Sequence, residues 1–198
     1  MSRAAVDVFD QLTGIAPGSP LDVVRAARPE ARTHAQKSFE ALFAPADPGA
    51  FPILDRHAVA AFVAGLHQDA ITAEFYAARL ASLATDRGIS ESIAAEIKSG
   101  LAKGPYGSFP AGPLMAENVE GPRYRVASAN RQELGEPLSA ALEHAHLLVL
   151  HPRDASSEAL QTLLDAGLNT NAVVTLSQLV SFLSFQIRVI AGLRALAA

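Results

Sequence analysis

Two histidines, an aspartate and a tyrosine surround a break between two predicted helices: His57, His67, Asp69 and Tyr76. A histidine beside an aspartate is the smallest pair that can act as general acid and general base. Asp69, Thr72 and Tyr76 are spaced to share one helix face, at the N-terminal end where an anion is stabilised. The competing interpretation is structural, with Asp69 as N-cap, Tyr76 in the core and both histidines at the surface. We take the four residues as the candidate catalytic site.

A second group of polar residues, Glu143, His144 and His146, resembles a metal-ligand cluster. Residues two apart on a helix point in different directions, so His144 and His146 are not expected to hold one ion together. His144 and His151 share a face, but they are two turns, roughly 10 Å, apart. We therefore predict no metal site and interpret these residues as amphipathic positions of a half-buried helix.

The composition excludes several classes of chemistry. There is no cysteine among the 198 residues, which excludes disulfides, thiolate nucleophiles and cysteine-bound metals. The net charge is −4 and the basic residues are scattered, so nothing predicts nucleic-acid binding. The first residues lack the apolar core of a signal peptide, and a cytoplasmic location is expected.

The elements that position these residues are expected to be helices. The chain is 49% hydrophobic but only 6% aromatic, a composition rich in alanine and leucine that favours an all-α fold. The strongest helix is predicted over residues 171–193, which are apolar on every side except along a line of Ser177, Ser181, Ser184 and Arg188. A helix that is apolar all round must be covered all round, either inside the subunit or by a partner.

The alternative for residues 171–193 is a membrane span. Their aliphatic and phenylalanine side chains favour insertion by roughly −6 kcal/mol in total. Arg188, at up to about +3 kcal/mol, cancels much of this together with the glutamines and serines. We therefore predict a buried central helix and no membrane association.

Breaks rich in glycine and proline divide the chain. They predict an N-terminal helical extension (1–51), a first helical block (52–104), a glycine- and proline-rich connector (105–135) and a second block (136–198), packed as one compact domain. The connector is expected to be an ordered wrapping segment or lid, with a small hairpin as the alternative.

The two predicted blocks share a short pattern. DRGIS at residues 86–90 is echoed by DAGLN at 165–169, and each precedes a helix that follows two others. The echo suggests two stacked three-helix blocks.

At the His57–Tyr76 corner the sequence LDRHAVAAFVAGLHQDAITAEFYAARLASLATDRGISESIAAEI resembles the carboxymuconolactone decarboxylase and alkylhydroperoxidase D superfamily. The second block is similar to the C-terminal half of its peroxidase-related, two-block members. The resemblance covers about residues 52–193 and depends on block order and helix-ending glycines. It implies an alkylhydroperoxidase D-like helical fold.

The family's redox motif is not kept. Aligned residue by residue, its proton-relay glutamate falls at His57, its two cysteines at Asp69 and Thr72, and its histidine at Tyr76. A thiol-dependent peroxidase cycle needs a thiolate, which this chain cannot supply. The resemblance therefore implies the fold without the peroxidase activity, and it implies no cofactor.

Three functions are compatible with the sequence. The first is a non-catalytic or accessory family member, with a cysteine-bearing relative as a possible partner. The second is a cofactor-free decarboxylase or lactone-processing enzyme for a small carboxylic acid, with His57 or His67 as acid and base, Tyr76 as hydrogen-bond donor, and Arg56 or Arg79 as carboxylate anchor. The third is a module that binds a small acidic or apolar molecule.

The apolar excess also predicts self-association. Only 18% of residues are charged, so one subunit has more apolar helix surface than its own core requires. We expect a homo-oligomer, most simply a dimer with helix-on-helix contacts.

Overall fold

The computed structural model describes residues 7–85 and 87–197, and the statements below refer to these residues. It contains nine α-helices, two short 3-10 helices and no β-strand, so the predicted all-α class is confirmed. The α-helices are α1 (Val8–Thr13), α2 (Pro20–Ala26), α3 (Pro29–Phe43), α4 (Ile53–Leu66), α5 (Ala70–Leu83), α6 (Gly88–Gly100), α7 (Ser128–Leu150), α8 (Ser157–Asp165) and α9 (Thr170–Ala197); the 3-10 helices are η1 (Pro113–Glu117) and η2 (Pro152–Asp154).

The most enclosed helix is α4, which packs against α5, α6, α7 and α9. Every residue from 56 to 64 is buried. Many of these side chains are alanines, and small side chains let neighbouring helix axes approach closely. The centre of the molecule is therefore α4, and not residues 171–193 as the apolar pattern suggested.

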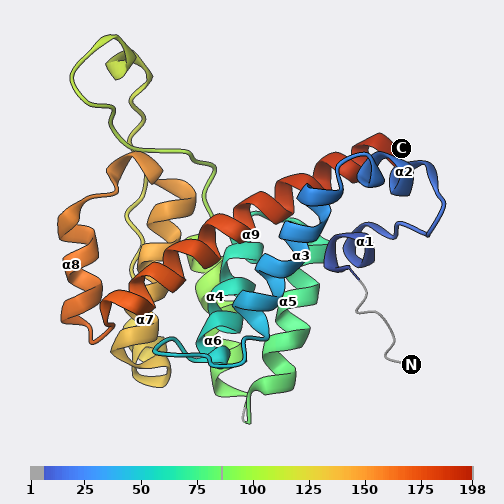
Figure 1. Ribbon diagram of the computed structural model, residues 1–198. Coiled ribbons are helices and arrows are strands. Elements are labelled where there is room, and N and C mark those ends of the chain that lie inside the picture. Colours follow the sequence, from blue (N-terminus) through green and yellow to red (C-terminus); the bar gives the residue numbers. More distant parts are fainter. Residues whose placement is uncertain (1–6, 86, 198) are drawn as a thin grey trace.

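The longest helix is α9, as predicted, and it crosses the whole molecule diagonally (Figure 1). Leu176, Leu183 and Ile190 on its inner side are fully buried. Its outer side is open, since Val174 and Phe185 are each 50% exposed. The expectation that this helix is covered all round is therefore not met within one chain.

Two further properties of α9 are its apolar character and the hydrogen bond of Arg188. It is the one helix of the described chain that is long and apolar enough to cross a membrane, and half of its most apolar window is buried inside the protein. Arg188, for which a partner was expected, donates from Nη1 to the Ser184 carbonyl of its own helix at 2.9 Å.

The N-terminal helices lie beside α9. The ring of Phe9 in α1 meets Phe182 edge-on, with 6.3 Å between centroids, and Phe39 of α3 is 6.5 Å from the same ring. Arg25 of α2 binds Asp7 and Asp10 at the start of α1. The predicted extension thus adds to the core instead of standing apart from it.

Helix α7 begins earlier than the predicted boundary at residue 136. Its first turns, from Ser128, precede a kink at Gly135, where φ is 76° and the next proline, Pro137, removes a backbone donor. The C-terminal end of the predicted connector is therefore helical.

The remaining part of the connector forms a projection that we call the arm (residues 105–122). It stands clear of the helices in Figure 1, with η1 at its tip. The hairpin that was the alternative for the connector does not form among the described residues, which contain one antiparallel bridge, between Gly107 and Val119. Arg153 of η2 holds the arm, because its guanidinium lies 4.2 Å from the Phe109 ring centroid and donates to the Glu117 carbonyl at 3.2 Å.

The short sequence echo places its two glycines, Gly88 and Gly167, at different points relative to the helix that follows. Asp86 lies outside the described residues. Gly167 has φ of 99°, whereas Gly88 begins α6 and is not among the glycines with positive φ. The two glycines therefore have different conformations.

Candidate functional site

Two of the four sequence-predicted site residues, His57 and Tyr76, lie in the core. The rings of both residues contact Phe43, at centroid distances of 5.0 and 5.3 Å. His57 Nδ1 donates to the Ile53 carbonyl at 2.9 Å, and the Tyr76 hydroxyl donates to Gln186 Oε1 at 2.6 Å. Burial lowers the pKa of His57 and raises the pKa of Tyr76. The tyrosine thus has the satisfied core role that was its alternative interpretation.

The other two, His67 and Asp69, lie at the turn between α4 and α5. Asp69 accepts the Thr72 amide at 2.9 Å and the Thr72 hydroxyl, which makes it the N-cap of α5. It also pairs with Arg194 at 3.3 Å. His67 Nε2 is 3.3 Å from Ser184 Oγ, and burial followed by the charge of Arg188 lowers its pKa.

The two arginines named as carboxylate anchors have other roles. Arg56 is buried, and its guanidinium donates to the carbonyls of Phe51, Leu42 and Pro48 at 2.9, 2.8 and 2.6 Å. Arg79 stacks on the Phe75 ring, 4.4 Å from its centroid, beside a wide, shallow depression between α1 and α5.

The structure therefore does not gather the predicted site around one cavity. His57, His67, Asp69 and Tyr76 line neither the depression beside Arg79 nor the groove described next.

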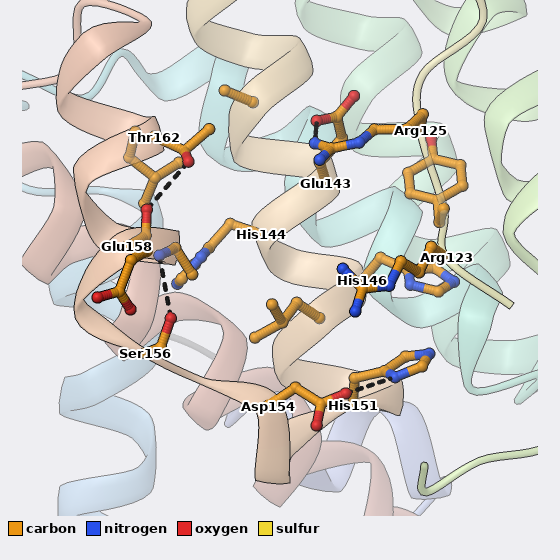
Figure 2. A pocket seen from close by; sticks show the side chains of 15 residues that line it. Arg123, Arg125, Glu143, His144, His146, His151, Asp154, Ser156, Glu158 and Thr162 are labelled. Carbon is orange, nitrogen blue, oxygen red and sulfur yellow. Dashed lines mark hydrogen bonds and ion pairs between the residues drawn. The ribbon is translucent and has the colours of Figure 1, made fainter. Parts of the chain in front are cut away.

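A polar groove of about 480 Å³ lies on the other side of the molecule. Its floor is one face of α7, formed by Ala140, Glu143, His144 and Leu147. One wall is α8 and the other is the segment 123–125, which follows the arm (Figure 2). Floor residues at spacings of three and four share a helix face, so the groove follows α7 for about two turns.

His144 is the residue of the groove floor best suited to acid–base chemistry. It is only 6% exposed, and within the described chain its imidazole makes no hydrogen bond. Burial lowers its pKa, so the neutral form, which has a free nitrogen lone pair, predominates at pH 7. Figure 2 shows this ring directed toward α8, beside Ser156 and Glu158.

The wall formed by residues 123–125 carries two arginines, and Glu143 on the floor is the acidic residue beside it. Arg125 pairs with Glu143 at 2.5 Å, and Arg131 and the Val126 amide bind the same carboxylate. Arg123, in contrast, is exposed and has no ion pair within the described residues. The groove thus has one free guanidinium available to an anionic ligand.

Two more histidines close one end of the groove. His146 donates from Nε2 to the Gly100 carbonyl at 3.0 Å and stacks on Tyr124, with 4.6 Å between ring centroids. His151 lies 3.1 Å from Asp154 through Nδ1 and 3.1 Å from the Pro122 carbonyl through Nε2. Both of its partners are acceptors, so both contacts are hydrogen bonds only when the ring carries two N–H groups.

The three histidines do not converge. His144 points toward α8, and His146 points toward the segment that carries Arg123 (Figure 2). Among the described residues no group of three or more histidine, aspartate or glutamate side chains is placed to hold a metal ion.

A buried carboxylate fixes the Arg123 wall in position. Glu96 of α6 is fully buried and accepts hydrogen bonds from the Tyr124 hydroxyl (2.6 Å), the Asn130 amide (2.6 Å), the Ala127 amide (3.0 Å) and Ser99 (3.1 Å). Burial raises its pKa, but the hydrogen bonds outweigh burial and the net pKa is lowered. Glu96 therefore remains ionised and ties the chain after the arm to α6.

Sequence reasoning missed the groove because it tested the histidine cluster for metal binding alone. The signal was the shared face of Glu143, His144 and Leu147 on a helix otherwise rich in alanine and leucine. The contribution of Arg123 and Tyr124 could not be seen, since their segment is irregular and is held against α6 and α7 by contacts between residues far apart in the sequence, such as Tyr124 with Glu96 and Arg125 with Glu143. Neither the models of known protein families nor the curated proteins include a match to this chain.

Proposed function

We propose that this chain binds a small carboxylic acid in the α7–α8 groove and processes it without a cofactor. Arg123 anchors the carboxylate, and His144 is the general base and acid. The observation that carries the proposal is His144 itself, a buried imidazole that faces the groove and makes no hydrogen bond within the described chain. Arg123, which has no ion pair among the described residues, lines the opposite side of the same groove. This is the second of the three functions compatible with the sequence, with its site moved from the His57–Tyr76 corner to the groove.

The chemistry of the groove suits a lactone or a carboxylic acid with an acidic C–H bond. For a lactone, neutral His144 takes a proton from the water that attacks the carbonyl carbon, and the imidazolium returns this proton to the ring oxygen as the C–O bond breaks. For a carboxylic acid, the C–C bond to the carboxylate breaks, carbon dioxide leaves, and the carbon that keeps the electron pair takes a proton that His144 delivers from water. Arg123 holds a carboxylate through two parallel hydrogen bonds, which also orients the ligand. No electron transfer is involved.

Binding is tested by following the histidine ring signals by NMR while acetate, succinate or γ-butyrolactone is added. We expect the signals of His144 to shift with succinate and the signals of His57 to stay unchanged. Arg123→Gln should weaken succinate binding about tenfold, because one charge-assisted contact is lost. Arg28→Gln is the matched control, since Arg28 is also exposed and is far from the groove in sequence. An unchanged affinity in Arg123→Gln would exclude this anchor, and His144 signals that respond to none of the three compounds would exclude the proposed site.

A second function, that of an accessory family member, is favoured by the positions of the lost redox motif. His57, Asp69, Thr72 and Tyr76 all make hydrogen bonds inside or at the ends of helices, and none faces a cavity described above. A chain of this kind would act through a cysteine-bearing relative. Peroxide turnover by such a relative that rises when this protein is added would support the accessory function.

On its own, the protein is expected to have no peroxidase activity with dithiol donors. A thiol cycle requires a thiolate, and none of the 198 residues is a cysteine. The assay measures loss of an organic hydroperoxide in the presence of a dithiol, with heat-treated protein as the control and trace metals removed. Turnover above that control would contradict the prediction.

A further inference from the structure

The arm carries an apolar tip that its own chain does not cover. Leu114 and Met115 in η1 are 52% and 50% exposed, and Val119 on the returning side is 46% exposed. The arm is nevertheless well held: the Phe109 amide donates to Asn118 at 2.7 Å, and the Ser108 amide donates to Asp154 at 3.2 Å. A projection that is fixed at its base and apolar at its end is suited to insertion into another surface.

The outer face of α9 is the complementary surface. From residue 174 to residue 188 its exposed residues recur at helical spacing, and the two apolar ones, Val174 and Phe185, are each half exposed; the others are Gln178, Ser181 and Arg188. Gln178 and Ser181 lie between the two apolar residues along the helix. In Figure 1 helix α9 crosses the front of the molecule, and the arm projects beyond the helices at another point.

The charges of the two surfaces are opposite. Glu117 and Glu120 are the charged residues of the arm, which has no lysine or arginine. Arg188 and Arg194 are the charged residues of α9, which has no aspartate or glutamate. Arg194 already pairs with Asp69, whereas Arg188 contacts only the carbonyl of its own helix. Arg188 is therefore free to meet an acidic side chain of a docked arm.

We infer that the arm of one chain docks on the outer α9 face of a second copy, with Leu114 and Met115 against Phe185 and Glu117 beside Arg188. A two-fold axis would let both arms engage at once, which gives a closed dimer. The arm also leads directly into Arg123, so docking of the arm fixes the start of one groove wall. This inference is independent of the chemistry proposed for the groove.

The test is sedimentation velocity of the full-length protein over a range of concentrations. We expect a dimer whose dissociation constant rises about tenfold or more in the double variant Leu114→Asp/Met115→Asp. The control is Val23→Asp/Val24→Asp, which changes two equally exposed valines on α2 and should leave the dimer intact. Circular dichroism checks that each variant is folded, as expected for substitutions at exposed sites.

Charge reversal tests the specific pairing of Glu117 with Arg188, which a loss of apolar surface alone would not test. Glu117→Arg and Arg188→Glu should each weaken the dimer, and the two together should restore most of its affinity. A monomer at every concentration, or a dimer that the arm variants leave unchanged, would overturn the inference. So would recruitment of the wild-type monomer to vesicles of anionic phospholipid through Phe185, because the α9 face would then belong to a membrane.

Discussion

Replacing Glu96 with alanine is expected to lower the free energy of unfolding by about 3–5 kcal/mol. The substitution leaves the Tyr124 hydroxyl, the Ala127 amide and the Asn130 amide without their buried acceptor. Urea unfolding followed by circular dichroism measures the loss. Glu91→Ala, on the exposed side of the same helix, should change stability by less than about 1 kcal/mol.

The same substitution should change the dependence of stability on pH. The pKa of Glu96 is lower in the folded chain than in the unfolded chain, so its contribution is complete above the unfolded pKa, about 4.3, and is lost as pH falls through the folded value. Glu96→Ala should therefore lose more stability at pH 7 than at pH 3. An equal loss at both values would show that the carboxylate is not the ionised acceptor described above.

The fold class and the longest helix could be predicted from the sequence because both depend on local pattern. Alanine- and leucine-rich runs between Gly–Pro breaks specify helices, and the uninterrupted run after Asn169 specifies α9. The choice of centre could not be predicted in the same way. α4 is shorter and less bulky than α9, but its alanines let five other helices surround it, and that packing is a property of the whole chain.

In the candidate site, too, the roles set by local spacing could be predicted, and the contacts between distant residues could not. The roles of Asp69 as N-cap and Tyr76 as a satisfied core residue were visible as alternatives, because capping and burial follow from spacing. The pairing of Tyr76 with Gln186 joins residues more than a hundred positions apart, and no local pattern predicts it. For the groove, the same holds for the contact that brings Tyr124 to Glu96.

His144→Gln is expected to lower turnover of a lactone or small carboxylic acid by about 10²–10⁴-fold, the usual contribution of a positioned acid–base group. Glutamine keeps the size and polarity of the side chain but cannot exchange a proton, so succinate should still bind and the loss should fall on kcat. Arg123→Gln should instead raise KM. Release of carbon dioxide or opening of the lactone ring is the measured quantity.

The dependence of that turnover on pH provides a separate criterion. Burial lowers the pKa of His144, so a reaction that uses its neutral form should be insensitive to pH near 7 and should decline only as pH falls below the ordinary histidine value of about 6.5. In His144→Gln this decline should disappear from the residual rate. His57→Ala and Tyr76→Phe are the decisive comparison, because both residues are buried away from the groove and should affect stability more than kcat. If turnover is abolished in those two variants and kept in His144→Gln, the catalytic site is the α4–α5 corner and the groove proposal is wrong.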